Sequence, residues 1–169
     1  RFAMVTPLSG LTCDLTTLHT FTNPGDKVAI PPFTRGGFPF GIRKFHRERV
    51  FLPVDEATYA PNAEKAKAVL SAERPKLAYL GSSFIFFPHP VREVVDHVRA
   101  TNLPTKVVFD GAHVLGLIAT GEFQDPLREG AEVVLFLYGI MAQGTAVGSL
   151  LLGSALGIAA GEDFGSEGS

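Results

Sequence analysis

Short apolar runs rich in β-branched residues alternate along this chain with segments whose apolar residues recur at the helical period. Such alternation is typical of an α/β fold, in which helices cover a mostly parallel sheet. Most of the runs are apolar at successive positions, as strands buried on both faces are. We expect strands at 27–30, 50–54, 77–81, 106–109, 132–136 and 149–152.

Segments of helical period lie between these runs, at 11–21, 62–73 and 90–101. In the second segment, Ala66 and Leu70 lie on one helix face with other apolar residues, while charged residues fill the remaining positions. This pattern predicts amphipathic helices packed on the sheet. The sequence therefore indicates a three-layer α/β domain, with a site expected at the carboxyl ends of the strands.

The chain has 169 residues, of which 46% are hydrophobic, so it can bury the core of one domain or of one piece of a larger domain. We expect this core over residues 1–155 and a polar Gly/Ser-rich tail over residues 156–169. Arg1 is followed at once by an apolar run, which suggests that the chain begins inside a longer protein.

Charge and cysteine content restrict the partners and the compartment. The formal net charge of -2 gives no global field toward nucleic acid or a membrane surface. No run reaches the roughly 18 to 20 apolar residues of a membrane span. The single Cys13 excludes an internal disulfide and fits a reducing compartment, so we expect a cytoplasmic protein.

A carboxylate follows the expected strand 106–109, where Asp110 precedes Gly111, Ala112 and His113. A carboxylate at a buried strand end costs free energy unless it meets a cation or hydrogen-bond donors. The protonated nitrogen of a pyridine ring would be such a partner, with His113 in reach of the phenolic oxygen or the face of that ring. The alternative is an Asp110 that caps the next turn and a His113 bonded to backbone.

The residues Ser9, Gly10, Leu11 and Thr12 lead into the first expected helix. Backbone N–H groups at a helix start bind phosphate, and the hydroxyls of Ser9 and Thr12 add donors. An ordinary helix N-terminus explains these residues equally well. Together with Asp110, this helix start outlines the two ends of a pyridoxal phosphate site.

These motifs resemble the large domain of fold-type I pyridoxal-phosphate enzymes, and most closely that of serine hydroxymethyltransferase, from about Met4 to Leu152. PLSGLTCDLTTLHTFTNPGDKV is similar to the phosphate-binding turn, helix and PGD turn of the family, and TRGGFPFG is similar to its HGGHLTHG segment. RPKLAYLGSSFIF resembles the strand with a serine after glycine, and VVFDGAHVLGLIATGEFQDPL resembles the DMAHxxGL segment. AEVVLFLYGIMAQGTAVGSLLLG occupies the place of the THK motif and the glycine-rich return.

The resemblance implies a set of cofactor-binding residues: Ser9, Gly10, Leu11, Arg35, Ser83, Asp110 and His113. The first three would surround the phosphate, and Asp110 would pair with the pyridine nitrogen. Ser83 and His113 would lie near the phenolic oxygen. Arg35 would lie over the ring or meet a carboxylate.

The family's cofactor-binding lysine is replaced by another residue in this chain. Aligning VVLF and Gly144 without a gap places Tyr138, Gly139 and Ile140 on the Thr, His and Lys of the family, and no lysine follows Lys106. Ile140 has no amine, so it can neither bind the cofactor aldehyde covalently nor move protons at the substrate's alpha carbon.

Both histidines of the HGGH segment are also replaced, because Arg35 and Phe38 occupy their positions. Phe38 can stack on a ring, but neither residue can supply the acid/base chemistry of histidine. Phenylalanines gather in the two loops that the resemblance places around the site, namely Phe33, Phe38, Phe40, Phe84, Phe86 and Phe87. They indicate either core packing or an apolar plug where the cofactor would lie.

Other polar residues carry weaker signals. His46 lies in the basic run 43–49, which predicts a solvated edge or a subunit contact, with an anion site as the alternative. We expect structural roles for His19 and His89. Cys13 lies in the first turns of a helix, whose dipole would lower the thiol pKa, but no Cys/His/Asp relay is evident.

We therefore expect a serine hydroxymethyltransferase-like protein with a degenerate site, in which pyridoxal phosphate binds non-covalently or has been lost. The family reaction transfers a one-carbon unit between serine or glycine and tetrahydrofolate. One alternative is a non-catalytic paralogue that acts as an assembly or regulatory subunit through the family's dimer surface. Another is a fragment or altered sequence of an active enzyme. The expected partners are a second copy or a related subunit and an amino-acid ligand, with no metal, nucleic acid or membrane.

Overall fold

The computed structural model of the chain describes residues 9–135. The strand expected at 149–152, the position of Ile140 and the tail 156–169 with its boundary lie outside the described residues. The described elements are, in order, α1 (Gly10–Phe21), β1 (Lys27–Ile30), the 3-10 turn η1 (Phe33–Arg35), β2 (Glu48–Phe51), α2 (Ala63–Glu73), β3 (Leu77–Gly81), α3 (Val91–Ala100), β4 (Lys106–Asp110), α4 (Leu115–Thr120) and β5 (Val133–Leu135).

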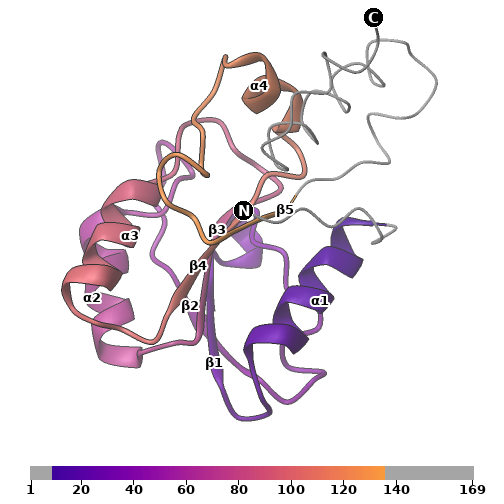
Figure 1. Ribbon diagram of the computed structural model, residues 1–169, viewed down its shortest axis with the longest axis vertical. Coiled ribbons are helices and arrows are strands. Elements are labelled where there is room, and N and C mark those ends of the chain that lie inside the picture. The colour runs from indigo at the N-terminus through magenta and orange to yellow at the C-terminus, as the bar shows by residue number, and fades with distance from the viewer. Residues whose placement is uncertain (1–8, 136–169) are drawn as a thin grey trace, which may run out of the picture.

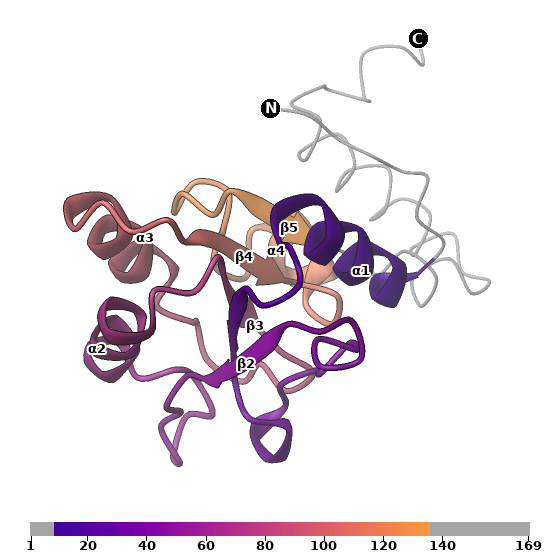
Figure 2. The ribbon, with the colours of Figure 1, turned by 90° about the horizontal axis from the view of Figure 1, so that it is seen from below.

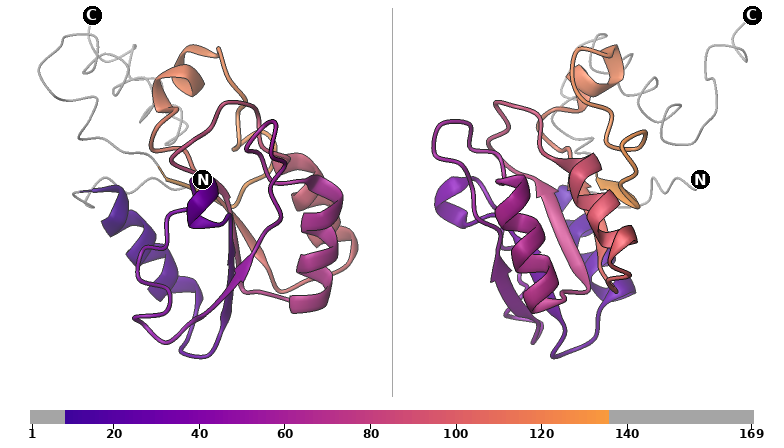
Figure 3. Two further views of the ribbon diagram at one scale, coloured as in Figure 1. Left: turned by 180° about the vertical axis from the view of Figure 1, so that it is seen from behind. Right: turned by 90° about the vertical axis from the view of Figure 1, so that its left-hand side faces the viewer.

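The five strands form one sheet in the order β2-β1-β3-β4-β5, and every neighbouring pair is parallel (Figure 1). Helix α1 covers one face of this sheet, while α2 and α3 cover the other (Figure 2). The right-hand view of Figure 3 shows α2 and α3 side by side in front of the strands. The expected three-layer α/β fold is confirmed.

Alternation along the strands explains the three layers, because successive side chains point to opposite faces of a sheet. On the α1 side, Val28, Tyr79 and Val108 pack with Leu18 of the helix. On the other side, the intervening strand residues pack with α2 and α3, among them Phe109, which is fully buried. Both faces are therefore apolar, as the sequence indicated.

The three longer helices lie within one residue of their expected bounds. Strand β2 differs more, since it spans Glu48–Phe51 instead of the expected 50–54. The amide of Leu52 still donates to the carbonyl of Ile30, but Pro53 has no N–H with which to continue the ladder. The short α4 was not expected, because six residues carry little helical periodicity.

The carboxyl ends of the parallel strands meet along one edge of the sheet. Ile30, Gly81, Asp110 and Leu135 end their strands at this edge. A short turn joins the end of α1 to the start of β1, so the first residues of α1 also lie toward this edge. The elements that carry the expected phosphate and ring-nitrogen residues therefore converge at one end of the sheet.

None of the helices within residues 9–135 is long and apolar enough to cross a membrane.

Candidate cofactor site

Asp110 lies at the end of β4, where it pairs with Gly81 of β3. Its Oδ1 accepts the N–H of Ala112 at 3.0 Å. Burial raises the pKa of the Asp110 carboxyl, although the N–H of Ala112 and the nearby His113 act in the opposite direction. The ion pairs within residues 9–135 do not include Asp110. A desolvated carboxyl group that forms no ion pair can stabilise a cationic N–H group brought to it.

Gly81 allows the ends of β3 and β4 to approach each other. Its φ is +83°, and a Cβ at this position would lie 2.1 Å from the carbonyl oxygen of Asp110. Its N–H donates to Nδ1 of His89 at 2.9 Å. The backbone beside Asp110 is therefore held by a contact that only glycine permits and by a buried imidazole.

A narrow hollow lies over this strand edge. It is lined by Ile30, Pro31, Phe38, Phe40, Tyr79, Gly81, Ser82 and Asp110. Its volume is about 10 Å³, close to that of a single water probe. The ring of Phe40 is buried against Tyr79 with 4.7 Å between centroids, whereas Phe38 is 40% exposed. An aromatic ligand can therefore reach Asp110 only if the lining moves, and Phe38 is the more exposed of its two phenylalanine rings.

Two backbone contacts fix the loops around the hollow. The N–H of Ser83 donates to the carbonyl of Gly36 at 2.8 Å, which joins the loop after β3 to the loop after β1. At Gly37, a Cβ would lie 1.8 Å from the carbonyl oxygen of Pro31. The hydroxyl of Ser82 donates to the carbonyl of Phe84 at 2.8 Å. Both loops are thus shaped by main-chain contacts.

Most of the expected cofactor-binding residues do not line the hollow. Of the seven, Asp110 alone lines it. The side chains of Ser83 and His113 are exposed. Arg35 forms an ion pair with Glu56 at 3.0 Å, and its guanidinium lies 5.4 Å from the ring centroid of Tyr59. The structure thus directs Arg35 toward the segment after β2.

Ser9 is the N-cap of α1. Its Oγ accepts the N–H of Thr12 at 3.1 Å, and its carbonyl accepts the N–H of Cys13 at 3.1 Å. Among the first amides of the helix, those of Gly10 and Leu11 are therefore not used by the cap and can donate to another group. The arrangement is that of an ordinary capped helix, and it also leaves two amides of the kind that bind an anion.

Two buried polar residues near Asp110 were missed in the sequence. Asp14 is only 2% exposed and shares the buried face of α1 with Thr17 and Leu18. Burial, and secondarily the charge of Asp110, raise the pKa of Asp14 to about 8. Burial likewise raises the pKa of Tyr79. The spacing of Asp14 from Leu18, one helical turn, was the available signal that this carboxyl group faces the core.

The weaker signals have mixed outcomes. Arg47 is buried and donates to both oxygens of Thr22 and to the carbonyl of Phe45, so it joins the end of α1 to the segment before β2. Arg43, Lys44 and His46 are exposed, as a solvated edge requires. Burial and the nearby carboxyl groups raise the pKa of the Cys13 thiol, so they outweigh any lowering by the helix dipole.

The phenylalanines of the two loops are mostly exposed, with fractions of 70% for Phe33, 51% for Phe84, 64% for Phe86 and 50% for Phe87. Core packing is therefore the wrong account for them and applies to Phe40 alone. The rings of Phe84 and Phe86 stack with centroids 6.4 Å apart. We call Phe33, Phe84, Phe86 and Phe87 the aromatic patch.

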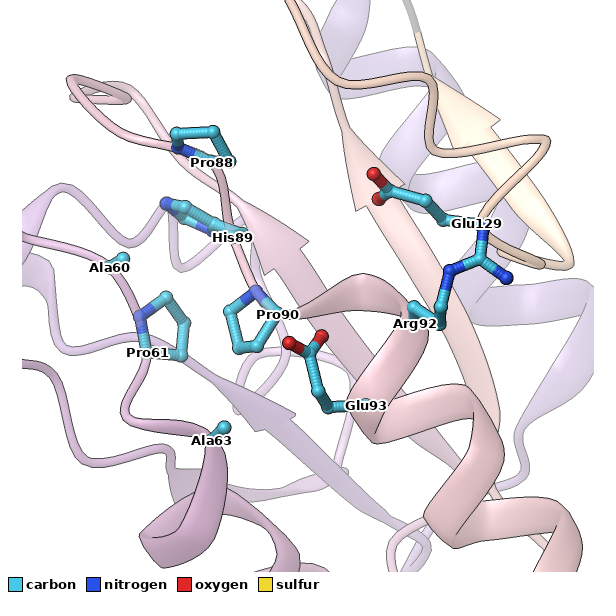
Figure 4. Close-up of a pocket in the computed structure, with 9 residues that line it drawn as sticks. All are labelled: Ala60, Pro61, Ala63, Pro88, His89, Pro90, Arg92, Glu93 and Glu129. Carbon is cyan, nitrogen blue, oxygen red and sulfur yellow. The ribbon is translucent and has the colours of Figure 1, made fainter.

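A second cavity of about 360 Å³ lies between the starts of α2 and α3 (Figure 4). His89 lines it and is 3% exposed. The backbone N–H of His89 donates to Oε1 of Gln124, whose Nε2 donates to the carbonyl of His89 and to Glu129. Desolvation lowers the pKa of His89 to about 4. The imidazole is neutral, and because Nδ1 accepts from Gly81 its proton lies on Nε2.

The side chains of residues 9–135 include no group of three or more His, Cys, Asp or Glu that could hold a metal ion.

Comparison with solved structures defines the class of the fold. The crystal structure of L-threonine transaldolase from Pseudomonas fluorescens, in its internal aldimine state, matches with a TM-score of 0.68 and 24% sequence identity. The match covers 76% of this chain and 29% of that chain. The chain therefore has the α/β fold of the fold-type I pyridoxal-phosphate enzymes.

Sequence comparison is more specific. The chain is 41% identical over 133 residues to serine hydroxymethyltransferase of Picrophilus torridus, 40% over 139 residues to that of Methanopyrus kandleri, and 38% over 133 residues to that of Thermoplasma acidophilum. These matches cover 76%, 78% and 76% of this chain. The chain is thus homologous to the serine hydroxymethyltransferase family over most of its length, as its motifs indicated. It spans only 30%, 32% and 31% of these relatives, and no protein-family model matches it.

Proposed function

We propose that this chain is the large-domain core of a serine hydroxymethyltransferase-like protein whose degenerate site binds pyridoxal phosphate without a covalent link. The observation that carries this proposal is the carboxyl group of Asp110. It is desolvated at the end of a central strand, it accepts one backbone N–H, and it takes part in none of the ion pairs of residues 9–135. A protonated pyridine nitrogen has the charge and the N–H that this group lacks.

The residues present fit the two ends of the cofactor. Asp110 would hold the proton on the ring nitrogen, and the first-turn amides of Gly10 and Leu11 would bind the phosphate. Phe38 would move aside to admit the pyridine ring. When bound, pyridoxal phosphate supplies an electron-withdrawing ring for reactions at the alpha carbon of an amino acid.

The same site lacks the groups that would complete catalysis. Ile140 occupies the lysine position by alignment, and Arg35 and Phe38 occupy the two histidine positions. What remains can bind and orient a pyridine ring and exclude water from it, but it offers no amine to form the covalent link. We therefore expect the family's one-carbon transfer to be absent from this chain.

The first test is a pyridoxal phosphate titration followed by dialysis and by borohydride reduction. We expect saturable binding that dialysis reverses and no added mass after reduction. Asp110→Asn should weaken binding about tenfold or more, since a hydrogen bond to a charged group contributes about 1.5 to 3 kcal/mol. Asp96→Asn, on the exposed side of α3, is the matched control. Cofactor retained on the protein after reduction, or unchanged affinity in Asp110→Asn, would overturn the proposal.

A second test restores the missing amine. If the alignment at Ile140 is correct, Ile140→Lys should make part of the bound cofactor reducible onto the protein. Mass spectrometry of peptides from the reduced sample locates the modified residue. Modification at other lysines alone would show that the alignment of this segment is wrong.

The second candidate function is that of a non-catalytic assembly or regulatory subunit in the cytoplasm. The aromatic patch supports it, because neighbouring exposed aromatic side chains, such as the stacked pair Phe84 and Phe86, commonly mark protein interaction surfaces. The partner would be a second copy of this chain or a related subunit. Light scattering on the purified chain tests the homodimer, and Phe86→Ser should shift it toward monomer. A monomer that also fails to associate with a related subunit would remove this candidate.

A further inference from the structure

Helix α1 contributes to the ring-nitrogen end of the site, together with strands β3 and β4. The register Gly81↔Asp110 and Tyr79↔Val108 places the side chains of Tyr79 and Asp110 on the same face of the sheet. This is the face that α1 covers, and Tyr79 and Val108 belong to its hydrophobic cluster. The buried side of α1 carries Asp14, Thr17 and Leu18. Asp14 is the first of the three, so it lies nearest the edge where β4 ends in Asp110.

Two polar groups that face Asp110 from this layer are buried. Asp14 is 2% exposed and Tyr79 is 3% exposed. Within the described residues, Oδ1 of Asp14 has no hydrogen-bond partner, whereas Thr17 lies close enough to the Tyr79 hydroxyl to act on its pKa. A buried polar atom without a partner is uncommon in folded proteins and calls for an explanation, such as a bound group, an ordered water or a catalytic role. These two atoms lie on the layer that meets the hollow, whose wall includes Tyr79 and Asp110.

Two carboxyl groups buried in one layer cannot both ionise at low cost. The titratable groups that act on Asp14 and its neighbours are Cys13 on the same helix, Tyr79 on β3 and Asp110 on β4. The other strands packed against α1 contribute apolar residues to this cluster, among them Ile30 and Leu135. His113 favours the charged form of Asp110 and not that of Asp14. The surroundings therefore separate the two carboxyl groups into one that ionises and one that keeps its proton.

We propose that Asp14 is a positioning residue of the ring-nitrogen site: Asp14 and Asp110 together present a single negative charge to the ligand. Asp14 is the group of the two that keeps its proton. One negative charge balances the one positive charge of a protonated pyridine ring. A second charge in this layer would raise the cost of folding and change the protonation of any bound ring. The ligand's identity rests on the proposed function, whereas the retained proton is a property of this chain alone.

The direct test is a titration of the aspartate side-chain carboxyl carbons by NMR, on the chain labelled with ¹³C-aspartate. In the wild-type chain, we expect one carboxyl group with a midpoint several pH units above the others, and this resonance should be missing from Asp14→Asn. Asp110→Asn should lower the midpoint of Asp14. Asp96→Asn should leave it unchanged. Titration of every aspartate near its ordinary range, or a midpoint of Asp14 that ignores Asp110→Asn, would overturn the proposal.

Asn is close to Asp in size, so Asp14→Asn should fold, and circular dichroism checks this. If it does not fold, the midpoint of Asp14 in Asp110→Asn and Tyr79→Phe still decides the question. Pyridoxal phosphate affinity measured against pH gives the second readout. The wild-type affinity should change through the Asp14 midpoint, whereas that of Asp14→Asn should not. A chain that binds no pyridoxal phosphate would remove the proposed function and leave the NMR test intact.

Discussion

The backbone N–H of Gly81 donates to Nδ1 of His89 over 2.9 Å, so a buried imidazole fixes the end of β3 beside Asp110. The ring of His89 also packs edge-on against Phe109, with 6.2 Å between centroids. Because the backbone of His89 bonds to Gln124, the segment after α4 is tied to the same point. Changes at His89 should therefore affect both the stability of the chain and the geometry at Asp110.

The pH dependence of stability should reveal the neutral state of His89. Its folded pKa, about 4, lies below the ordinary 6.5, so the unfolded chain takes up this proton first. The contribution of neutral His89 to the free energy of unfolding is present above pH 6.5. It is lost as the pH falls toward 4, at roughly 1.4 kcal/mol per pH unit. His89→Asn keeps an acceptor near the Nδ1 position and removes the titration. Urea unfolding at pH 4.5 and 6.5 should show a smaller acid loss in this variant.

The control for this measurement is His19→Asn, since His19 is exposed on α1. It should retain the acid loss of the wild-type chain. An equal acid loss in His89→Asn would show that His89 is already protonated in the folded state.

Asp14 should act on stability in the opposite direction. Its folded pKa of about 8 lies above the ordinary 3.8, so its contribution is present at low pH and is lost as the pH rises through 8. Both chains contain His89, so its titration cancels when the two chains are compared between pH 6.5 and 8. Asp14→Asn should gain stability relative to the wild-type chain across this interval. A constant difference between the two chains at pH 6.5 and pH 8 would contradict a retained proton.

Glycine at position 81 should contribute strongly to the stability of the fold. Gly81→Ala adds a methyl group 2.1 Å from a backbone oxygen at a φ of +83°, and should cost about 3 kcal/mol. Gly121 has a φ of +78°, but a Cβ added there would meet no atom within 4 Å, so Gly121→Ala should cost only about 1 kcal/mol of backbone strain. Denaturant midpoints of the two variants give the comparison. Equal costs would mean that the close approach of β3 and β4 relaxes freely.

Phe38 should limit access to Asp110. Because the hollow holds only about 10 Å³, removing this ring should lower the Kd for pyridoxal phosphate severalfold in Phe38→Ala. Phe33→Ala is the matched control, since Phe33 is 70% exposed and does not line the hollow. Weaker binding in Phe38→Ala would indicate instead that Phe38 contributes more by stacking on the ring.

The sequence predicted the parts of the fold that depend on local pattern. Strand β3 has the expected bounds because all of its residues are buried and apolar or small. Strand β2 is an edge strand with exposed residues, and its end depends on Pro53. Asp110 could be found from its place after a strand. Asp14 and Tyr79 could not be joined to it, because their proximity arises from the packing of α1 on β3 and β4. The partner of Arg35 is likewise set by tertiary structure, since Glu56 lies 21 residues away.

The main-chain link between Ser83 and Gly36 has a consequence for how such a site can diverge. The loops that frame the hollow are held to each other by an amide and a carbonyl, and Gly37 lies against the carbonyl of Pro31. None of these contacts uses the side chains that would react with a ligand. Substitutions at reactive positions can therefore accumulate at little cost to folding stability. A protein of this design can lose or change its catalytic activity and still fold.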